Sequence, residues 1–326
     1  MIVPDYWAEA RVVHRDRGRQ ITMRRFGWSM LSQDDAQAMA ESRAADALRQ
    51  QLAGKPQAQR DRKVAYNGAQ GLPIREEVLS RHGEHVITRN AYGAHCLNTA
   101  DVVFADIDFA EKPPLKHTFG VFALLLLGAI IGGIRFHSAG LAFVFALFAL
   151  IGASPVSRLV WKARISLRGG QTHIARQGIA QFAATRPNWN IRLYATPGGL
   201  RLLLTHQPFA SDHPEISTFF TAVGVDPLYA RMCSLQHCFR ARLTAKPWRI
   251  GIRQRMRPSP GIWPINPAKL ETRRAWVTHY EAIAKSYAAC RYLDSIGSGQ
   301  IHASIAAVVT LHDRESQALN GQLPLA

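Results

Sequence analysis

Acidic residues and cysteines are scarce in this chain of 326 residues. Only 23 Asp and Glu side chains stand against 40 Lys and Arg, which gives a formal net charge of +17. A surplus of this size favours contact with polyanions, meaning nucleic acids, nucleotides or anionic membrane surfaces, and it does not choose among them. The four cysteines are too few for a disulfide scaffold, so we expect reduced thiols in a cytosolic compartment.

Several catalytic signatures are also missing. The chain has no Walker A motif, no Rossmann glycine fingerprint, no Gly-x-Ser-x-Gly elbow and no His-Glu-x-x-His helix. Its first residues contain no apolar run typical of a cleavable signal peptide, so none is expected. Cys233, His237 and Cys238 are clustered but lack the second ligand pair of a structural zinc site, which favours buried free thiols.

Two long apolar runs are present instead. Residues 118–134 and 139–154 carry no charge and are separated only by the short segment 135–138. Each run is about 16–17 residues, near the short end of the roughly 17–25 that cross a bilayer as a helix. Adjacent runs of this kind predict a transmembrane helical hairpin, and the alternative is a buried hairpin in a soluble core.

Charges around the hairpin predict its orientation. Lysines and arginines lie on both of its flanks, at Lys112, Lys116, Arg158, Lys162, Arg164 and Arg168. The turn carries only Arg135, so the positive-inside rule places both termini on the cytoplasmic side of a bacterial-type inner membrane. Residues 1–112 and 159–326 would then be two halves of one cytoplasmic domain, interrupted by the transmembrane hairpin at 113–158.

The rest of the chain predicts an α+β fold. Alternating or β-branched runs predict strands at 19–29, 84–90, 101–109 and 238–245, and a β-hairpin at 190–206. Capping and helical periodicity predict helices at 32–54, 169–186, 212–224, 226–236, 266–293 and 300–321, and residues 91–100 are expected to form a loop. Because strands and helices alternate irregularly, we expect a mixed or antiparallel central sheet.

Asp106 and Asp108 form the first candidate site. On a strand, residues two positions apart point to the same face. Two carboxylates there can hold Mg²⁺ or Mn²⁺ through oxygen and support phosphoryl or nucleotidyl transfer. The alternative is a polar strand end with no chemistry.

A glycine-rich turn follows ninety residues later, at Thr196-Pro197-Gly198-Gly199. Glycines in such a turn let backbone N–H groups approach phosphates closely. A strand with Asp-x-Asp, followed by a Thr-Pro-x-Gly-Gly turn and a basic strand, resembles the bifunctional primase/polymerase branch of the archaeo-eukaryotic primase superfamily. The resemblance implies a primase-like α+β core and a metal-dependent nucleotidyltransferase site.

The resemblance also assigns residues. It places the metal pair at Asp106 and Asp108, and nucleotide phosphate at Thr196, Gly198 and Gly199. The family has a histidine on the second strand, where this chain has Arg201. Arginine binds phosphate well but does not act as a titratable acid or base. His206 would face away from Arg201 on a regular strand, and Asp226 and Asp294 are both candidates for the family's third acid.

A basic strip follows at residues 238–257. It contains Arg240, Arg242, Lys246, Arg249, Arg253, Arg255 and Arg257, with Phe239 and Trp248 between them. Such a strip is suited to a phosphate backbone, with the aromatic rings offering stacking surfaces. It is equally suited to lie against anionic lipid headgroups.

The segment leading into the Asp-x-Asp strand is the last candidate. Arg89, Asn90, Tyr92, His95 and Asn98 make it polar and turn-rich, which is typical of a substrate-binding loop and equally of strand-end capping.

Two function hypotheses result. The first is a membrane-anchored nucleotide- or nucleic-acid-binding protein with a metal-dependent site. The second is a non-enzymatic integral membrane protein whose basic domain binds anionic lipid or a protein partner; the arginine at position 201 and the unassigned third acid favour it.

Overall fold

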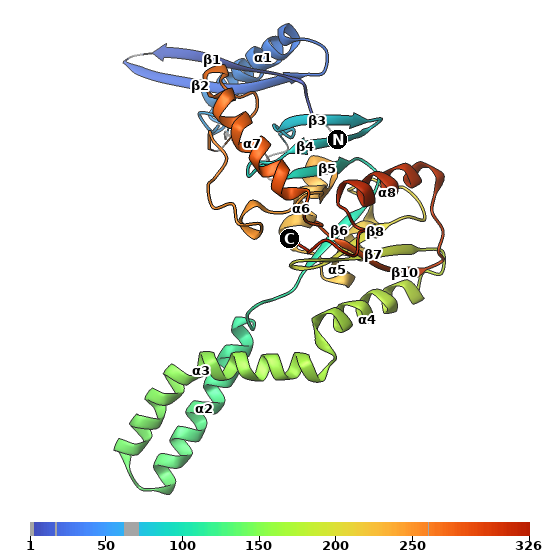
Figure 1. Ribbon diagram of the computed structural model, residues 1–326. Coiled ribbons are helices and arrows are strands. Elements are labelled where there is room, and N and C mark those ends of the chain that lie inside the picture. Colours follow the sequence, from blue (N-terminus) through green and yellow to red (C-terminus); the bar gives the residue numbers. More distant parts are fainter. Residues whose placement is uncertain (1–2, 17, 62–71, 260) are drawn as a thin grey trace.

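The computed structural model describes residues 3–16, 18–61, 72–259 and 261–326. It has a mixed α+β architecture in which the paired strands are antiparallel, with two four-stranded sheets and one two-stranded ribbon. Two long apolar helices project away from these sheets (Figure 1). The predicted α+β class is therefore confirmed, and of the two expected kinds of sheet, mixed or antiparallel, the antiparallel kind is observed.

The first four-stranded sheet has the order β10-β7-β8-β6. Its strands are β6 (Phe104–Asp108), β7 (Asn190–Thr196), β8 (Gly199–Leu204) and β10 (Arg291–Gly297). Strands β7 and β8 are joined by the two-residue turn Pro197-Gly198, as a hairpin with a glycine in the turn favours. Every residue of β8 is buried, which explains its nearly continuous apolar sequence.

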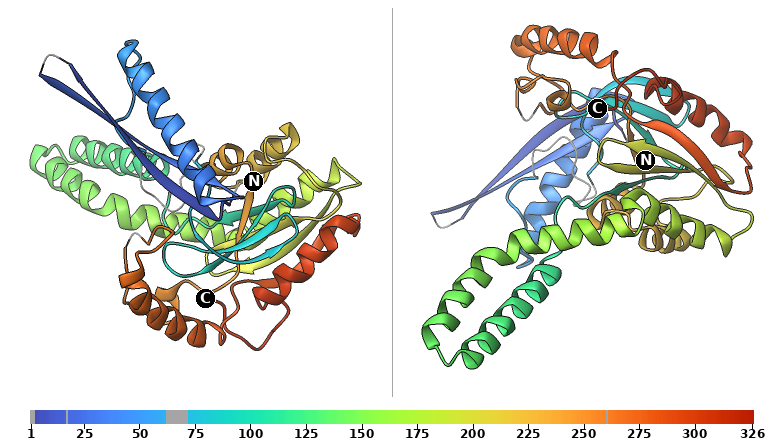
Figure 2. Two further views of the ribbon diagram at one scale, coloured as in Figure 1. Left: turned by 90° about the horizontal axis from the view of Figure 1, so that it is seen from above. Right: turned by 60° about the horizontal axis from the view of Figure 1, so that its bottom comes forward.

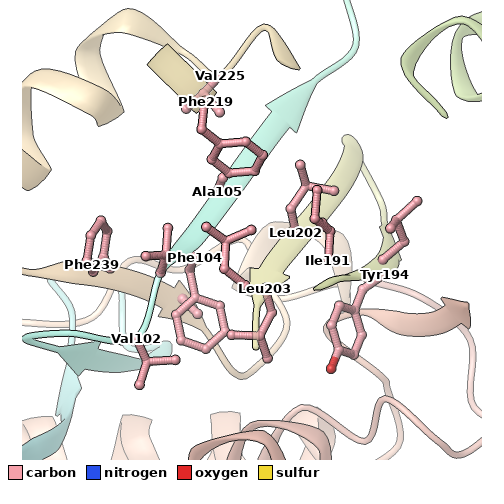
Figure 3. Packing of buried hydrophobic residues seen from close by; sticks show 14 of the residues in the cluster. Val102, Phe104, Ala105, Ile191, Tyr194, Leu202, Leu203, Phe219, Val225 and Phe239 are labelled. Carbon is pink, nitrogen blue, oxygen red and sulfur yellow. The ribbon is translucent and has the colours of Figure 1, made fainter. Parts of the chain in front are cut away.

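A hydrophobic core surrounds this sheet. Side chains from β6, β7 and β8 interdigitate with Phe219, Val225 and Phe239, as Figure 3 shows. Helices α4 (Gly170–Ala184), α5 (Pro214–Val223) and α8 (Ala303–Glu315) contribute buried residues to the same cluster. The sheet that carries Asp106 is therefore rigidly supported.

The second four-stranded sheet has the order β3-β4-β5-β9. Its strands are β3 (Glu77–His82), β4 (His85–Arg89), β5 (His95–Thr99) and β9 (Phe239–Arg242). Helix α6 (Pro227–Gln236) precedes β9, and α7 (Leu270–Ala284) contacts β4 and β5 through Glu281. The short 3-10 helices η2 (Pro247–Arg249) and η3 (Pro267–Lys269) lie between them in sequence.

A two-stranded ribbon stands apart from both sheets. Strand β1 (Tyr6–Asp16) pairs along its whole length with β2 (Arg19–Ser29). Helix α1 (Gln33–Leu52) packs on one face through Ala36, Ala40 and Ala44. Both views of Figure 2 show this ribbon projecting from the body of the molecule.

The hairpin consists of α2 (Leu115–Arg135) and α3 (Ala139–Leu167). Both helices are long and apolar enough to cross a membrane, and nearly nine-tenths of each apolar window is unburied by the protein. Ser157 joins them at their base, where its hydroxyl lies 2.9 Å from Nδ1 of His117 and 3.0 Å from the hydroxyl of Thr118. Large exposed side chains such as Phe119, Leu124 and Phe148 are a poor fit to water.

The hairpin interrupts a continuous structure. Strand β6 lies before it in sequence and pairs with β8, which lies after it. Strands β5 and β9 are related in the same way. The two flanking segments therefore share both sheets, which is the arrangement expected of one domain with an inserted hairpin.

Several predicted elements were wrong. Residues 95–99 form a central strand, not a loop, because buried Asn98 donates to the carbonyls of Val86 and Cys96 and so satisfies its amide inside the sheet. The predicted helix at 266–293 ends at Ala284, and its last residues form β10, which pairs with β7. Strands β1 and β3 were not predicted, and α3 extends well beyond residue 154.

Candidate functional site

A pocket of about 330 Å³ opens where the edges of the two four-stranded sheets meet. The phenol of Tyr229 joins these edges: its oxygen lies 2.9 Å from the carbonyl of Phe104 on β6 and 3.0 Å from that of Arg240 on β9. It also accepts the N–H of Arg240 at 3.2 Å. A pocket between two sheet edges collects side chains from segments that are distant in sequence.

Most of the predicted site residues line this one pocket. They are Asn90, Tyr92, Asp106, Asp108, Thr196, Gly198, Arg240, Arg242, Lys246 and Arg249. The remaining lining residues, Glu76, Ala91, Cys96 and Tyr229, were not predicted. Arg89, Asn98, Gly199 and Arg201 do not line it.

Asp106 and Arg201 form a cross-strand ion pair. They are directly opposite in the β6–β8 register, and Nε and an Nη of Arg201 donate to the two carboxylate oxygens of Asp106 at 2.8 and 3.0 Å. The other Nη of Arg201 donates to the carbonyl of Arg242 at 2.6 Å. Burial disfavours the charged guanidinium, but Asp106 outweighs it and the pKa of Arg201 is raised.

This geometry changes the role expected of Arg201. Its side chain is 1 % exposed and all three guanidinium nitrogens donate within the protein, so it supports the pocket from below and does not contact a phosphate there. The pairing of Arg201 with Asp106 was not predicted from the sequence. The ligand-binding role is corrected to a positioning role for Asp106.

Asp108 is in a different environment from Asp106. It is exposed, lies opposite Gly199 in the β6–β8 register, and forms no ion pair with another described residue. A Cβ added to Gly198 would lie 3.3 Å from Oδ1 of Asp108 and 3.7 Å from an Nη of Arg249. A larger side chain at position 198 would therefore crowd Asp108 and contact Arg249.

Gly199 is needed for strand pairing. A Cβ added there would lie 1.9 Å from the carbonyl oxygen of Ile107, which no relaxation of a side chain relieves. The second glycine of the turn thus lets β8 approach β6, and only Thr196 and Gly198 of the predicted phosphate turn reach the pocket.

Arg240 is held by a buried acid. One Nη of Arg240 lies 2.9 and 2.7 Å from the two carboxylate oxygens of Glu76, and the other donates to Asn98 at 3.0 Å. Thr88 also donates to Glu76, whose side chain is 2 % exposed. Glu76 was not predicted, because a single glutamate in an irregular segment carries no recognisable pattern.

Arg242, Lys246 and Arg249 make the pocket electropositive. Burial lowers the pKa of Arg242, and the neighbouring Arg201 lowers it further. Burial likewise lowers the pKa of Lys246, and Arg242 and Arg249 add to this effect. Neither Lys246 nor Arg249 forms an ion pair within the described part of the chain.

The aromatic residues of the basic strip divide between pocket and core. Trp248 is more than half exposed, lies 5.2 Å from the ring of Tyr92, and holds the ammonium of Lys246 5.5 Å from its centroid. Phe239 is fully buried in the main core, so the expectation that it offers a stacking surface was wrong.

The polar segment before β6 has two roles. Asn90 and Tyr92 line the pocket, and the side-chain oxygen of Asn90 accepts the N–H groups of Tyr92 and Ala94. Arg89 is instead a structural residue: its guanidinium pairs with Glu77 at 3.0 Å and Glu281 at 2.8 Å. Asn98 is buried and hydrogen-bonded inside the second sheet.

The residues present fit a divalent cation only in part. Asp226 caps α6 and Asp294 pairs with Arg176, so neither candidate third acid lies in the pocket. No group of three or more His, Cys, Asp or Glu side chains able to hold a metal occurs in the described residues. Two carboxylates suffice for Mg²⁺ when substrate phosphates complete its coordination. Asp106 and Asp108 are the predicted metal ligands that lie in the pocket, and both oxygens of Asp106 accept hydrogen bonds from Arg201.

Comparisons with protein-family models, curated proteins and solved structures find no match to this chain.

Proposed function

We propose that this protein is a membrane-anchored nucleotide-binding protein whose pocket holds the phosphates with Arg242, Lys246 and Arg249. The observation that supports this most directly is the convergence of Lys246, Arg249, Asp108 and Gly198 on one pocket from three separate chain segments. Basic groups without carboxylate partners in a partly buried pocket bind anions more strongly than exposed ones do.

The charge balance supports a specific order of binding. Asp106 is neutralised by Arg201 and Glu76 is paired with Arg240, which leaves Asp108 as the unpaired acid among the described lining residues. Arg242, Lys246 and Arg249 outnumber it. A free divalent cation is therefore repelled, whereas a nucleotide enters first and brings phosphate oxygens that attract Mg²⁺ or Mn²⁺ to Asp106 and Asp108.

The anchoring half of the proposal rests on α2 and α3. Lys112 and Lys116 precede the hairpin and the basic residues of the last turns of α3 follow it, so both ends face the cytoplasm by the positive-inside rule. The pocket then lies in the cytoplasm, where nucleotides are abundant, and is held near the bilayer.

Isothermal titration of the full chain in neutral detergent with ATP tests the pocket. Hydrogen bonds to charged groups contribute about 1.5–3 kcal/mol each. We therefore expect K246A/R249A to weaken ATP binding by at least about a hundredfold. The matched control R274A/K285A removes the same charges from exposed positions on and after α7 and should leave affinity unchanged. Equal affinities in all three proteins would refute the proposal.

The first candidate includes metal-dependent nucleotidyl transfer at this pocket, and a second candidate is nucleotide binding at the same pocket without catalysis. The ion pair that occupies both oxygens of Asp106, together with the lack of a third acid in the pocket, favours nucleotide binding without nucleotidyl transfer. Incubating the protein with labelled nucleoside triphosphates and Mn²⁺ separates the two. Products that disappear in D106N/D108N indicate a transferase, and binding without products indicates the second candidate.

A further inference from the structure

The β1–β2 ribbon has one face covered by α1 and an opposite, open face that is exposed only over its outer part, since Arg75 lies over the buried rings of Trp7 and Phe26 near the base. Ala8, Ala10 and Val12 of β1 pack against the alanines of α1. Gly27 lies on the same face, where an added Cβ would be 2.1 Å from the carbonyl oxygen of Ala36. Because side chains alternate along a strand, the intervening residues point to the opposite face.

The open face carries a row of arginines. Arg11 is directly opposite Arg24 in the β1–β2 register, and Arg24 forms a parallel bridge with Arg60 on its other side. Directly paired residues point to the same face, so the three side chains lie side by side across the ribbon. All three are exposed, and Arg15 continues the row toward the ribbon tip.

Like charges in direct cross-strand pairs destabilise a sheet. No ion pair in the described part of the chain involves Arg11, Arg24 or Arg60. Arg15 donates to Gln20, a neutral residue. No acidic residue of the described chain therefore compensates the positive charges of the row, and these charges do not stabilise the fold.

The nearby acidic residues Asp61 and Glu9 do not form ion pairs with the row. Asp61, adjacent to Arg60, points to the α1 side, where it accepts the N–H of Phe26 and pairs with Arg43 at 3.1 Å. Glu9 shares the open face but lies toward the ribbon base, where it acts on Arg75. The ribbon thus neutralises the arginines of its covered face and leaves those of its open face available.

We infer that the open face of the β1–β2 ribbon binds the phosphate backbone of a nucleic acid. Adjacent strands are about 4.8 Å apart, so the row presents three guanidinium groups over about 10 Å. Arginine is suited to phosphate through paired N–H donors, and two-stranded ribbons fit the major groove of a duplex, which is about 12 Å wide.

The position of the ribbon separates this partner from a membrane. Figure 1 shows β1 and β2 at the end of the molecule opposite the α2–α3 hairpin, with both four-stranded sheets between them. A bilayer spanned by that hairpin lies away from the row. The inference does not depend on the pocket, since the ribbon contributes no residue to it.

Fluorescence anisotropy with a short labelled DNA duplex tests the inference, using the full chain in neutral detergent. Each phosphate contact contributes about 0.9 to the slope of log K against log salt concentration. We expect R11Q/R24Q/R60Q to lower that slope by about 2–3 and to weaken binding at least about tenfold at low salt. R11K/R24K/R60K keeps the charges and should retain most of the affinity.

The control R231Q/R274Q/K285Q removes three exposed charges from other surfaces and should bind as the wild type does. Equal loss in the control and the ribbon variant would mean that net charge alone drives binding, and would overturn the inference. So would unchanged binding by the ribbon variant. Because K246A/R249A leaves the ribbon intact, it should lose ATP binding while keeping duplex binding, so the two proposals fail separately.

Discussion

At the scale of single residues, Asp106 and Asp108 lie on the same face of β6 but have different partners. Asp106 is opposite an arginine and accepts two hydrogen bonds from it, whereas Asp108 is opposite a glycine and stays unpaired. The difference comes from the residues on β8, which pair with each position in turn. An Asp-x-Asp pattern by itself therefore does not define two equivalent metal ligands.

Lys246 gives a prediction about pH. Burial and the nearby Arg242 and Arg249 lower its pKa from the ordinary 10.5, so the free protein loses this charge at a lower pH than a normal lysine does. A bound phosphate favours the ammonium form and raises the pKa again. ATP affinity should therefore fall as the pH rises from neutrality through the lowered pKa, with proton uptake on binding.

Titrations in buffers of different ionisation enthalpy measure this proton uptake. K246R keeps its charge over the whole range, because arginine does not lose its proton at these pH values. Its ATP affinity should be nearly constant with pH. A decline of the same size in wild type and K246R would assign the effect to another group.

At the scale of elements, Arg201 connects the two sheets. Its ion pair lies within the β6–β8 pair, and its third nitrogen donates to β9 of the second sheet. Tyr229 makes a second connection between β6 and β9 through its hydroxyl. The pocket is therefore shaped by buried polar contacts at the sheet junction, and apolar packing supports it from the other side.

Replacing Arg201 should destabilise this junction. Removing one member of a buried ion pair costs about 3–5 kcal/mol, and the partial exposure of Asp106 places R201M near the lower end. We expect R201M/D106N to lose less free energy of unfolding than the sum of the two single variants, because neither charge is then left unpaired. Urea unfolding followed by tryptophan fluorescence measures this.

The exposed variant R274M serves as the control and should change the free energy of unfolding by less than about 0.5 kcal/mol. Strictly additive losses for R201M and D106N would show that the two side chains do not support each other.

At the scale of the whole molecule, the hairpin is inserted between strands that pair with each other. The apolar surface of the hairpin lies outside the core. The segments before and after the hairpin pair with each other as β6–β8 and β5–β9. The helices therefore contribute no residue to the buried core clusters of the described chain, and their exposed apolar surface suits a membrane anchor.

Cysteine labelling tests the proposed membrane topology. The four native cysteines are buried, so an introduced thiol should dominate the reaction with a membrane-impermeant maleimide. We expect H137C, in the exposed hairpin turn, to react in intact cells, and S298C, at the exposed residue directly after β10, to react only after the cells are permeabilised. The reverse pattern would place the pocket outside the cytoplasm.

The residues of the site that could be predicted from the sequence are those that belong to a short sequence pattern. Asp106, Asp108 and the Thr-Pro-Gly-Gly turn stood out because alternation and turn chemistry act over a few residues. Glu76 and Tyr229 did not, since one partner of each, Arg240 and Phe104 respectively, lies 164 and 125 residues away in sequence. The strand at 95–99 was mistaken for a loop for the same reason: its polar Asn98 is satisfied only by contacts across the sheet.

The hairpin helices, the α+β class and the acidic and basic residues available to a site can all be predicted from the sequence. These follow from composition and short-range periodicity, which act within one element. Which charges pair inside the protein depends on the fold. Arg201 pairs with Asp106, and Arg240 pairs with Glu76. Within the described residues, no ion pair involves Asp108, Lys246 and Arg249 in the pocket or Arg11, Arg24 and Arg60 on the ribbon. Pairing depends on strand register and sheet contact, and these bring together residues that the linear order keeps apart.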